Sequence, residues 1–521
     1  MPTRFSLDWD SPQIDELLGF LSAIMREERK TKKPLYKFVD LGFVNRLASN
    51  RNHVIFGRRG SGKSVLLREL ETRLESSRTH TVLIDVEQIA QKSYPNLIIE
   101  ILLISLRDLL AHTRAGLLNK LHLSRRNLAR EIEAEIRRLE SLYQKPDEVK
   151  QKVLEREQKE SKTEFSEEIS TIQSILRLAA NLSNRKATEQ AIEEEATWKK
   201  IGALFNSIGN YRALINKWLE EMGYDALYIL VDDFYQIDLL HQPLIADYLK
   251  RLLRGIPCYL KVATVRNRSL LFVKDNLTEA GLQAAHDYTS LDLDFSLDDF
   301  SQARNFLSTI LRNVCEGRLG PLNPDSLFES DGVDALDILT EASGGNPRDF
   351  INLLHDIIAT KRMSRAKTPI THSDILISVV NYYDREIKKD MERTYLNFHI
   401  LNSFLKQVIA VCQENADIGF YVSNKDLKNY PAISSLIGQL ADSRFIHLLT
   451  LAYDPPSPDD KPASAYVMSM GIYGEYLADK AMSLQGRQLV KKPYPKLSVS
   501  ELSNQFAEQV PELVLIGKNL E

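Results

Sequence analysis

Cysteine is scarce in this chain of 521 residues, which contains only Cys258, Cys315 and Cys412. The three thiols are too widely spaced for a CxxC metal knuckle and too few for a disulfide framework. The ten histidines are scattered without the spacing of metal ligands, which argues against a histidine-based metal site. We therefore expect a reducing, cytoplasmic setting.

The chain also lacks a long uninterrupted apolar run and an excess of charge of one sign. Its most hydrophobic segment, residues 97–118, is interrupted by Glu100, Arg107 and Asp108, so we expect a buried helix and no membrane partner. The first twenty residues carry Asp and Glu where a signal peptide needs apolar residues. The formal net charge is −4, so any site for a polyanion must be local.

Short apolar segments separated by helical sequence indicate the fold class. They lie at residues 81–89, 227–234, 259–265 and 288–295. Their spacing predicts an α/β fold, a three-layer domain with a mainly parallel sheet. We expect this core to span residues 38–297, after a helical segment at residues 1–37.

A long helical insertion is expected within the core, at residues 93–222. One apolar stripe recurs there at steps of three and four residues, through Leu128, Ile132, Ile136, Leu139 and Leu142. Lys145-Pro146 ends that helix, and the sequence that follows is too polar to bury much by itself. The insertion is either a solvated helical hairpin or a docking arm for a partner protein.

Two further regions follow the core. Residues 298–396 predict a small helical lid, in which Asn346 caps a helix that starts at Pro347, and Thr371 with Asp374 forms a capping box. Residues 397–521 predict helices followed by two strands, the order found in a winged helix.

The segment GRRGSGKS, at residues 57–64, fits the pattern GxxxxGK[ST], with a strand before it and an amphipathic helix after it. Such a loop turns backbone N–H groups onto phosphate oxygens at a helix N-terminus. Lys63 is expected to reach the β and γ phosphates of ATP, and Ser64 to bind Mg²⁺. The expected ATP-binding residues are Gly57, Arg58, Arg59, Gly60, Ser61, Gly62, Lys63 and Ser64.

An acidic pair ends the next apolar strand. Asp232 is expected on the metal side and Asp233 beside the attacking water. The strand at residues 259–265 leads into a polar tip, where Thr264, Arg266 or Arg268 could contact the γ-phosphate. Arg348 lies in the first helical turn after GGNP, where it could neutralise charge that develops during transfer.

In their order, these motifs resemble the AAA+ ATPases of the origin recognition complex type and the related STAND NTPases. The resemblance covers about residues 38–473, apart from the insertion. It implies that residues 57–64 are Walker A, that Asp232 and Asp233 are Walker B, that Thr264 or Arg266 is sensor 1 and that Arg348 is sensor 2. It also places residues 37–47 beside the adenine. Asp233 stands where AAA+ enzymes commonly carry Glu, so we expect slow hydrolysis.

Two functions fit this resemblance. One is a self-associating ATPase whose nucleotide state controls assembly on double-stranded DNA, as in origin recognition or loading. The other is a nucleotide-gated scaffold that recruits an effector protein through the insertion, for example in bacterial phage defence.

The sequence offers few basic contacts for DNA in the winged-helix region. The predicted recognition helix, residues 432–445, has Arg444 as its sole basic residue, and the wing is acidic. Better candidates are the basic segments at residues 25–37 and 486–496.

Overall fold

The computed structural model describes residues 8–26, 39–75, 78–115, 123–144, 200–275, 278–295, 297–316, 322–329, 334–395, 397–472 and 493–506. The chain forms two compact units. The helical unit comprises Met1–Leu41, Phe56–Arg68 and Asp292–Glu521, and the sheet unit comprises Gly42–Ile55 and Glu69–Leu291. The GRRGSGKS segment at residues 57–64 therefore belongs to the helical unit, and the Asp232-Asp233 pair to the sheet unit.

The sheet unit is built on a five-stranded sheet with the order β2-β3-β4-β1-β7. The strands are β1 (His53–Phe56), β2 (Thr79–Asp85), β3 (Ala226–Asp232), β4 (Cys258–Thr264) and β7 (Thr289–Asp292). β3 pairs in parallel with β2 on one side and β4 on the other, as predicted. Ala226 to Val231 are all buried, because a central parallel strand is covered on both faces.

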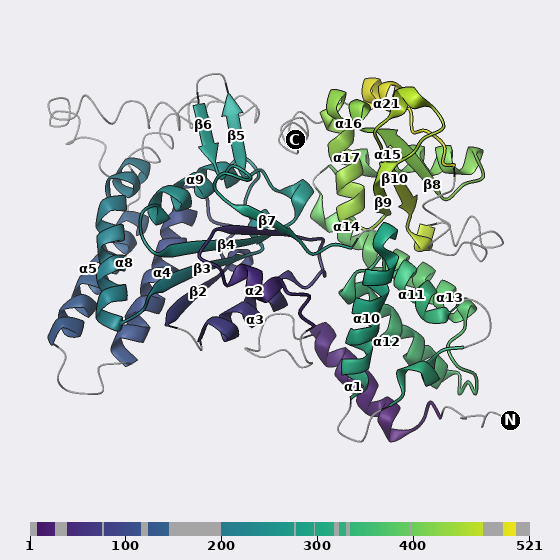
Figure 1. The fold of residues 1–521 in the computed structure, drawn as a ribbon, viewed down its shortest axis with the longest axis horizontal. Helices are drawn as coiled ribbons and strands as arrows, with labels where there is room; N and C mark the ends of the chain where they lie inside the picture. The colour runs from purple at the N-terminus through teal and green to yellow at the C-terminus, as the bar shows by residue number, and fades with distance from the viewer. Residues whose placement is uncertain are drawn as a thin grey trace. The chain divides into compact units, whose positions relative to one another are not determined.

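Helices of the insertion pack beside this sheet (Figure 1). The main ones are α4 (Asn96–Ala115), α5 (Leu123–Gln144) and α8 (Ile208–Met222), and α9 (Gln242–Leu253) follows β3. α4 contacts both β2 and α5, and α5 contacts α8. The predicted stripe of α5 is buried at Leu128, Ile132 and Leu139, which confirms the amphipathic helix. Residues 145–199, the other part of the proposed docking arm, lie outside the described residues.

Short elements complete the sheet unit. They are α2 (Phe43–Leu47), η1 (Val86–Gln88), η3 (Phe234–Gln236), η4 (Arg266–Arg268) and the hairpin β5 (Phe272–Asp275) with β6 (Thr278–Gly281). α3 (Lys63–Glu75) begins in the helical unit and continues into the sheet unit. None of the described helices is long and apolar enough to cross a membrane.

The first part of the helical unit is a helical array, in which α1 runs along α10 and α12 (Figure 1). Its elements are α1 (Pro12–Arg26), η5 (Leu297–Asp299), α10 (Phe300–Cys315), η6 (Pro324–Leu327), α11 (Ala335–Ala342), α12 (Pro347–Met363), α13 (His372–Tyr382), η7 (Tyr383–Ile387) and α14 (Lys388–Thr394). The Asn346 side chain caps α12, and Thr371 with Asp374 forms a capping box on α13. Both predicted caps are confirmed.

The C-terminal part of the helical unit combines helices with a three-stranded antiparallel sheet of order β8-β10-β9. Its elements are α15 (Phe398–Glu414), β8 (Gly419–Ser423), α16 (Asn424–Asn429), α17 (Pro431–Asp442), β9 (Ile446–Tyr453), η8 (Pro458–Asp460), β10 (Ala463–Met468) and α21 (Val499–Phe506). The sequence predicted β9 and β10 but missed β8, which is short and follows the polar turn after α15.

Candidate functional site

The GRRGSGKS segment forms a loop between the end of β1 and the start of α3 at Lys63. Gly60 and Gly62 have φ values of +89° and +96°, a region that glycine enters without the steric cost of a Cβ. The ammonium group of Lys63 donates to the carbonyl oxygens of Gly57 at 2.8 Å and Arg58 at 3.0 Å. The loop thus folds around its own lysine at a helix N-terminus.

Ser61 lies inside this loop. A Cβ added to Gly57 would be 2.3 Å from Ser61 Oγ, so a side chain at position 57 would require Ser61 to shift. Ser61 Oγ is buried and has no hydrogen-bond partner within the described part of the chain. Buried hydroxyl groups normally have a hydrogen-bond partner. A loop of this kind can bind a phosphate group, and an oxygen of that phosphate could accept the hydrogen bond of Ser61.

The start of α12 lies against the loop. Asn346 Nδ2 donates to the carbonyl oxygen of Arg59 at 2.9 Å. A Cβ at Gly60 would be 2.7 Å from Arg348 Cβ. The structure therefore brings Arg348 next to the glycine turn, although 284 residues lie between Lys63 and Arg348 in the sequence.

The two arginines of the loop are each held by a carboxylate. The backbone N–H of Arg58 donates to both oxygens of Asp294, at 3.0 and 2.8 Å. Arg59 Nη1 is 2.5 Å from Asp390 Oδ1. The other oxygen of Asp390 pairs with Arg444 Nη2 at 3.3 Å. Asp390 therefore links the loop to the segment between α17 and β9.

In the sheet unit, the acidic pair has a fixed backbone arrangement. The N–H of Asp233 donates to Asp232 Oδ1 at 2.9 Å. Asp233 is buried and has a φ of 52°, in the left-handed region. Such a conformation in a non-glycine residue is uncommon and costs free energy. It turns the chain sharply directly after β3.

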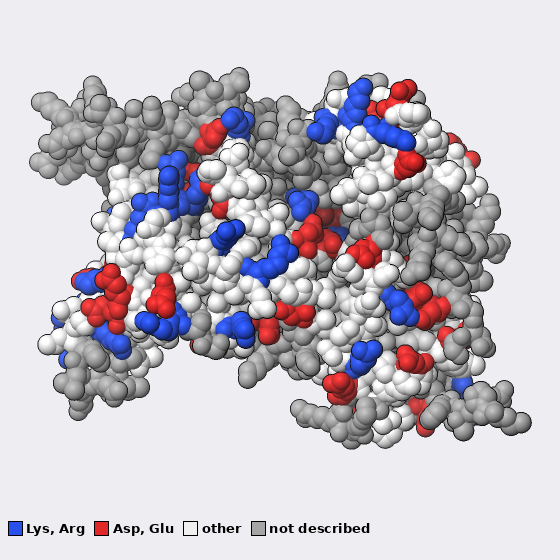
Figure 2. Space-filling model, in the orientation of Figure 1, with Lys and Arg blue, Asp and Glu red and all other residues white. Residues whose placement is uncertain are grey.

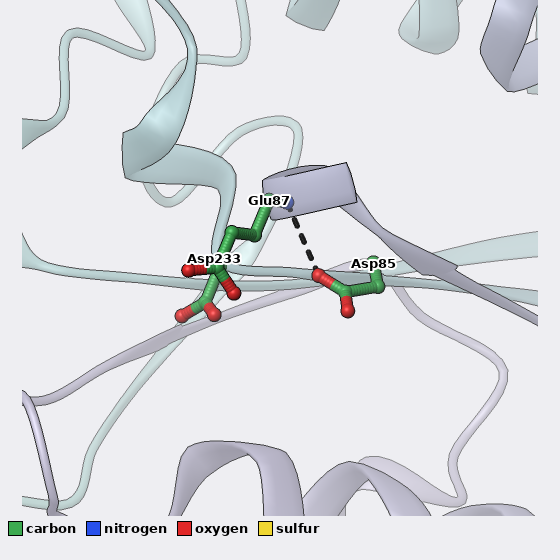
Figure 3. Close-up of side chains that lie close together, drawn as sticks. All are labelled: Asp85, Glu87 and Asp233. Atoms are coloured by element: carbon green, nitrogen blue, oxygen red, sulfur yellow. Dashed lines mark hydrogen bonds between the residues drawn. The ribbon is translucent and has the colours of Figure 1, made fainter. Parts of the chain in front are cut away.

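Asp233 lies close to two carboxylates that the sequence analysis did not single out. Side-chain oxygens of Asp85, Glu87 and Asp233 all lie within 4.8 Å of one another (Figure 3). Asp85 ends β2 and Glu87 follows in η1. Because β2 and β3 pair in parallel with Asp85 opposite Asp232, both strands deliver acidic residues to the same sheet edge. The sequence signal was the segment LIDVEQ, an apolar strand that ends in acids.

The other predicted residues of the sheet unit follow β4. Thr264, the last residue of β4, is fully buried, and its hydroxyl group shares a hydrogen bond with Ser269 Oγ. Arg266 is exposed in η4, and the Arg268 guanidinium lies 4.4 Å from the centroid of the Tyr235 ring. The hydroxyl group of Thr264 is thus engaged within the segment that follows β4.

Most of the basic residues considered for DNA contact either pair with a carboxylate or lie outside the residues that the structure describes. Arg444 is only 4% exposed and paired with Asp349 at 3.0 Å, so it is not available to a phosphate backbone. Lys496 pairs with Asp460, and Tyr494 is buried. Residues 27–38 and 473–492 lie outside the described residues. On the face drawn in Figure 2, described basic and acidic side chains form small interspersed groups.

The donor set of the site suits a magnesium nucleotide. The loop presents the Lys63 ammonium group, the buried Ser61 hydroxyl and the N-terminus of α3, all of which favour phosphate. Ser64 is the second residue of α3. Mg²⁺ prefers oxygen ligands. The Ser64 hydroxyl group in the helical unit is of this type, and so, in the sheet unit, is the Asp232 carboxylate.

No protein-family model matches the sequence, and no curated protein matches it. Solved structures similar to the fold include the ORC1 protein of Aeropyrum pernix in complex with DNA, at 11% identity over 93% of this chain and 97% of that chain, with a TM-score of 0.31. A Walker-type ATPase of Pyrococcus abyssi is 11% identical over 87% and 99%, with a TM-score of 0.37. Drosophila ORC bound to DNA is 9% identical over 92% and 95%, with a TM-score of 0.33. The functional proposal rests on the residues of the site.

Proposed function

We propose that this chain is an ATP-binding P-loop ATPase of the AAA+ type, with slow turnover, whose nucleotide state controls assembly. One observation supports the proposal most directly. The loop at residues 57–64 has two glycines at positive φ and places Lys63 at a helix N-terminus, the geometry that binds phosphate groups.

The predicted residues around the γ-phosphate and the metal ion receive these roles in the proposal. Lys63 contacts the β and γ phosphates, Ser64 and Asp232 hold Mg²⁺, and Arg348 contacts the γ-phosphate. Asp233 orients or deprotonates the attacking water. Thr264 and Arg266 are the sensor 1 candidates, and Thr264 acts through the hydroxyl network that it shares with Ser269. Mg²⁺, when bound, neutralises the charge of the phosphates.

The proposal includes the division of the chain. Residues 1–37 form an N-terminal helical segment, residues 38–297 the P-loop core with its 93–222 insertion, residues 298–396 a helical lid, and residues 397–521 a winged-helix-like domain and tail. The antiparallel strands β9 and β10 and the helices before them support the last assignment. The lid would respond to the bound nucleotide, because Arg348 lies beside the loop of the same chain.

A second candidate function is a nucleotide-gated scaffold that assembles with a protein effector, as in phage defence. The burial of Arg444 favours it, since this residue cannot contribute the phosphate contacts on which DNA affinity depends. The insertion, with its exposed charges such as Arg107 and Glu140 on α4 and α5, is the candidate docking region.

Phosphate release from ATP, measured at steady state with and without duplex DNA, tests the two candidates. A slow rate that DNA strongly stimulates supports assembly on DNA. ATP binding with turnover that DNA does not change supports the scaffold. If the chain neither binds ATP nor releases phosphate, the ATPase proposal is wrong.

A further inference from the structure

Arg58, the second residue of the loop, directs its side chain into the helical unit. The residue is 7% exposed. Its Nη2 donates to the carbonyl oxygen of Gly344 at 2.8 Å, and its Nη1 lies 3.1 Å from His447 Nδ1. Gly344 lies in the turn before α12, and His447 lies on β9. One guanidinium group therefore contacts both the lid and the C-terminal part.

The backbone of Arg58 is held at the same time. Its N–H donates to both oxygens of Asp294, and its Nε lies 3.4 Å from Asp294 Oδ1. Its carbonyl oxygen accepts from Lys63 Nζ at 3.0 Å. A displacement of Arg58 would therefore shift an acceptor of the lysine that is expected to bind phosphate.

His447 is chemically suited to receive the guanidinium group. A guanidinium can only donate, so His447 Nδ1 must be the acceptor and carry no proton. Burial, followed by the charges of Arg58 and Arg444, lowers the pKa of His447 to about 3. The ring is therefore neutral at physiological pH. A Cβ at Gly344 would lie 2.3 Å from the imidazole, so the ring rests directly on that glycine.

We propose that Arg58 is a positioning residue of the nucleotide site, which transmits the placement of Gly344 and His447 to the phosphate loop. His447 then supports ATP binding from the C-terminal part by acting through Arg58. The proposal deepens the assignment of the ATP site and rests on it. The sequence motif alone places Arg58 among the ATP-binding residues. Under this proposal Arg58 supports ATP binding through its contacts with the lid and with β9.

The affinity for ATP with Mg²⁺ tests this role in the full chain. Arg58→Met and His447→Leu each remove one side of the contact. Each is expected to weaken ATP binding about tenfold, because the loss of a hydrogen bond to a charged group lowers the fraction of molecules whose loop is arranged to bind phosphate. The double variant is expected to bind no more weakly than Arg58→Met, because both changes break the same link. If the two losses multiply, His447 acts independently of Arg58 and the proposal is overturned.

Two conservative variants keep the test valid if an apolar substitution prevents folding. His447→Gln retains an acceptor and is expected to bind ATP within about twofold of the unaltered chain, whereas Arg58→Lys loses the two-armed contact and is expected to bind more weakly. Arg385→Gln, which removes an exposed ion pair with Asp356 elsewhere in the lid, is the matched control and should not change the affinity. Equal affinities for Arg58→Lys and the unaltered chain would contradict the proposal.

Hydrogen exchange separates this inference from the ATPase assignment. Without nucleotide, His447→Leu is expected to speed amide exchange in a peptide that covers residues 57–62, and Arg385→Gln is not. Unchanged exchange there would overturn the positioning role even if ATP binds. If the unaltered chain binds ATP no better than Lys63→Ala does, the ATPase assignment is wrong. The exchange experiment still tests the positioning role of Arg58 in that case, because it needs no nucleotide.

Discussion

Arg444 and Asp349 form a buried ion pair, with Arg444 Nη1 3.0 Å from Asp349 Oδ1 and both side chains about 5% exposed. Burial disfavours the charge of Arg444, but Asp349, Tyr382 and Asp390 outweigh it and raise the pKa of the guanidinium. Arg444 also has a φ of 67°, which a residue with a Cβ adopts at a cost. Arg444 thus forms this ion pair from a strained backbone conformation.

The ion pair leads to a stability prediction. Arg444→Met leaves Asp349 buried without its main partner, so we expect the free energy of unfolding to fall by about 3–5 kcal/mol. Urea unfolding measures this loss. Arg304→Gln, which removes part-exposed ion pairs with Asp334 and Asp337 in the same unit, should cost about 1 kcal/mol. An Arg444→Met chain as stable as the Arg304→Gln chain would contradict the buried pair.

The buried ring of His447 makes the free energy of unfolding depend on pH. Its pKa is about 3 in the folded chain and about 6.5 when unfolded, so the unfolded chain binds more protons between these values. Stability that is present above pH 6.5 is therefore lost as the pH falls toward 3, at up to about 1.4 kcal/mol per pH unit. Urea unfolding at several pH values between 4.5 and 6.5 gives the slope of the free energy of unfolding against pH. This slope should be smaller for His447→Gln than for the unaltered chain. Identical slopes would mean that His447 is not buried as a neutral ring.

A pair of glycine substitutions separates backbone strain from contact with the lid. A Cβ at Gly62 meets nothing within 4 Å, whereas a Cβ at Gly60 would be 2.7 Å from Arg348 Cβ. Both have positive φ, so each alanine should cost about 1 kcal/mol in strain. Gly60→Ala should lose about 1–3 kcal/mol more through overpacking. Thermal unfolding compares them, and equal losses would contradict the contact between the loop and Arg348.

Asp233→Asn tests the catalytic assignment with little change of shape. Asparagine tolerates the left-handed conformation of Asp233, so ATP binding should persist. Loss of a general base lowers turnover by about 100-fold or more. Steady-state phosphate release measures this change. Asp225→Asn, at an exposed site just before β3, is the control and should turn over normally. Full turnover by Asp233→Asn would remove Asp233 from the mechanism.

The sequence predicted the parts of the site that are contiguous. The loop at residues 57–64, its flanking strand and helix, and the caps at Asn346 and Thr371 each lie within a few residues of one another. Local chemistry determines such elements, so a single sequence is enough to find them.

Contacts between distant segments were not predictable in the same way. Arg58 meets His447 across 389 positions, and Asp85 and Glu87 join Asp233 only because β2 and β3 are neighbours. Arg444 looked like a surface arginine because its partners Asp349 and Asp390 lie on other helices. Such placements depend on tertiary packing, which residue patterns do not encode locally.

The central proposal, that the loop binds ATP through Lys63, is tested most directly by calorimetric titration of the full chain with ATP and Mg²⁺. We expect saturable binding by the unaltered chain and none by Lys63→Ala, while Lys217→Ala, which removes an exposed lysine paired with Glu131, binds normally. Equal ATP binding by Lys63→Ala and the unaltered chain would contradict the assignment of the loop.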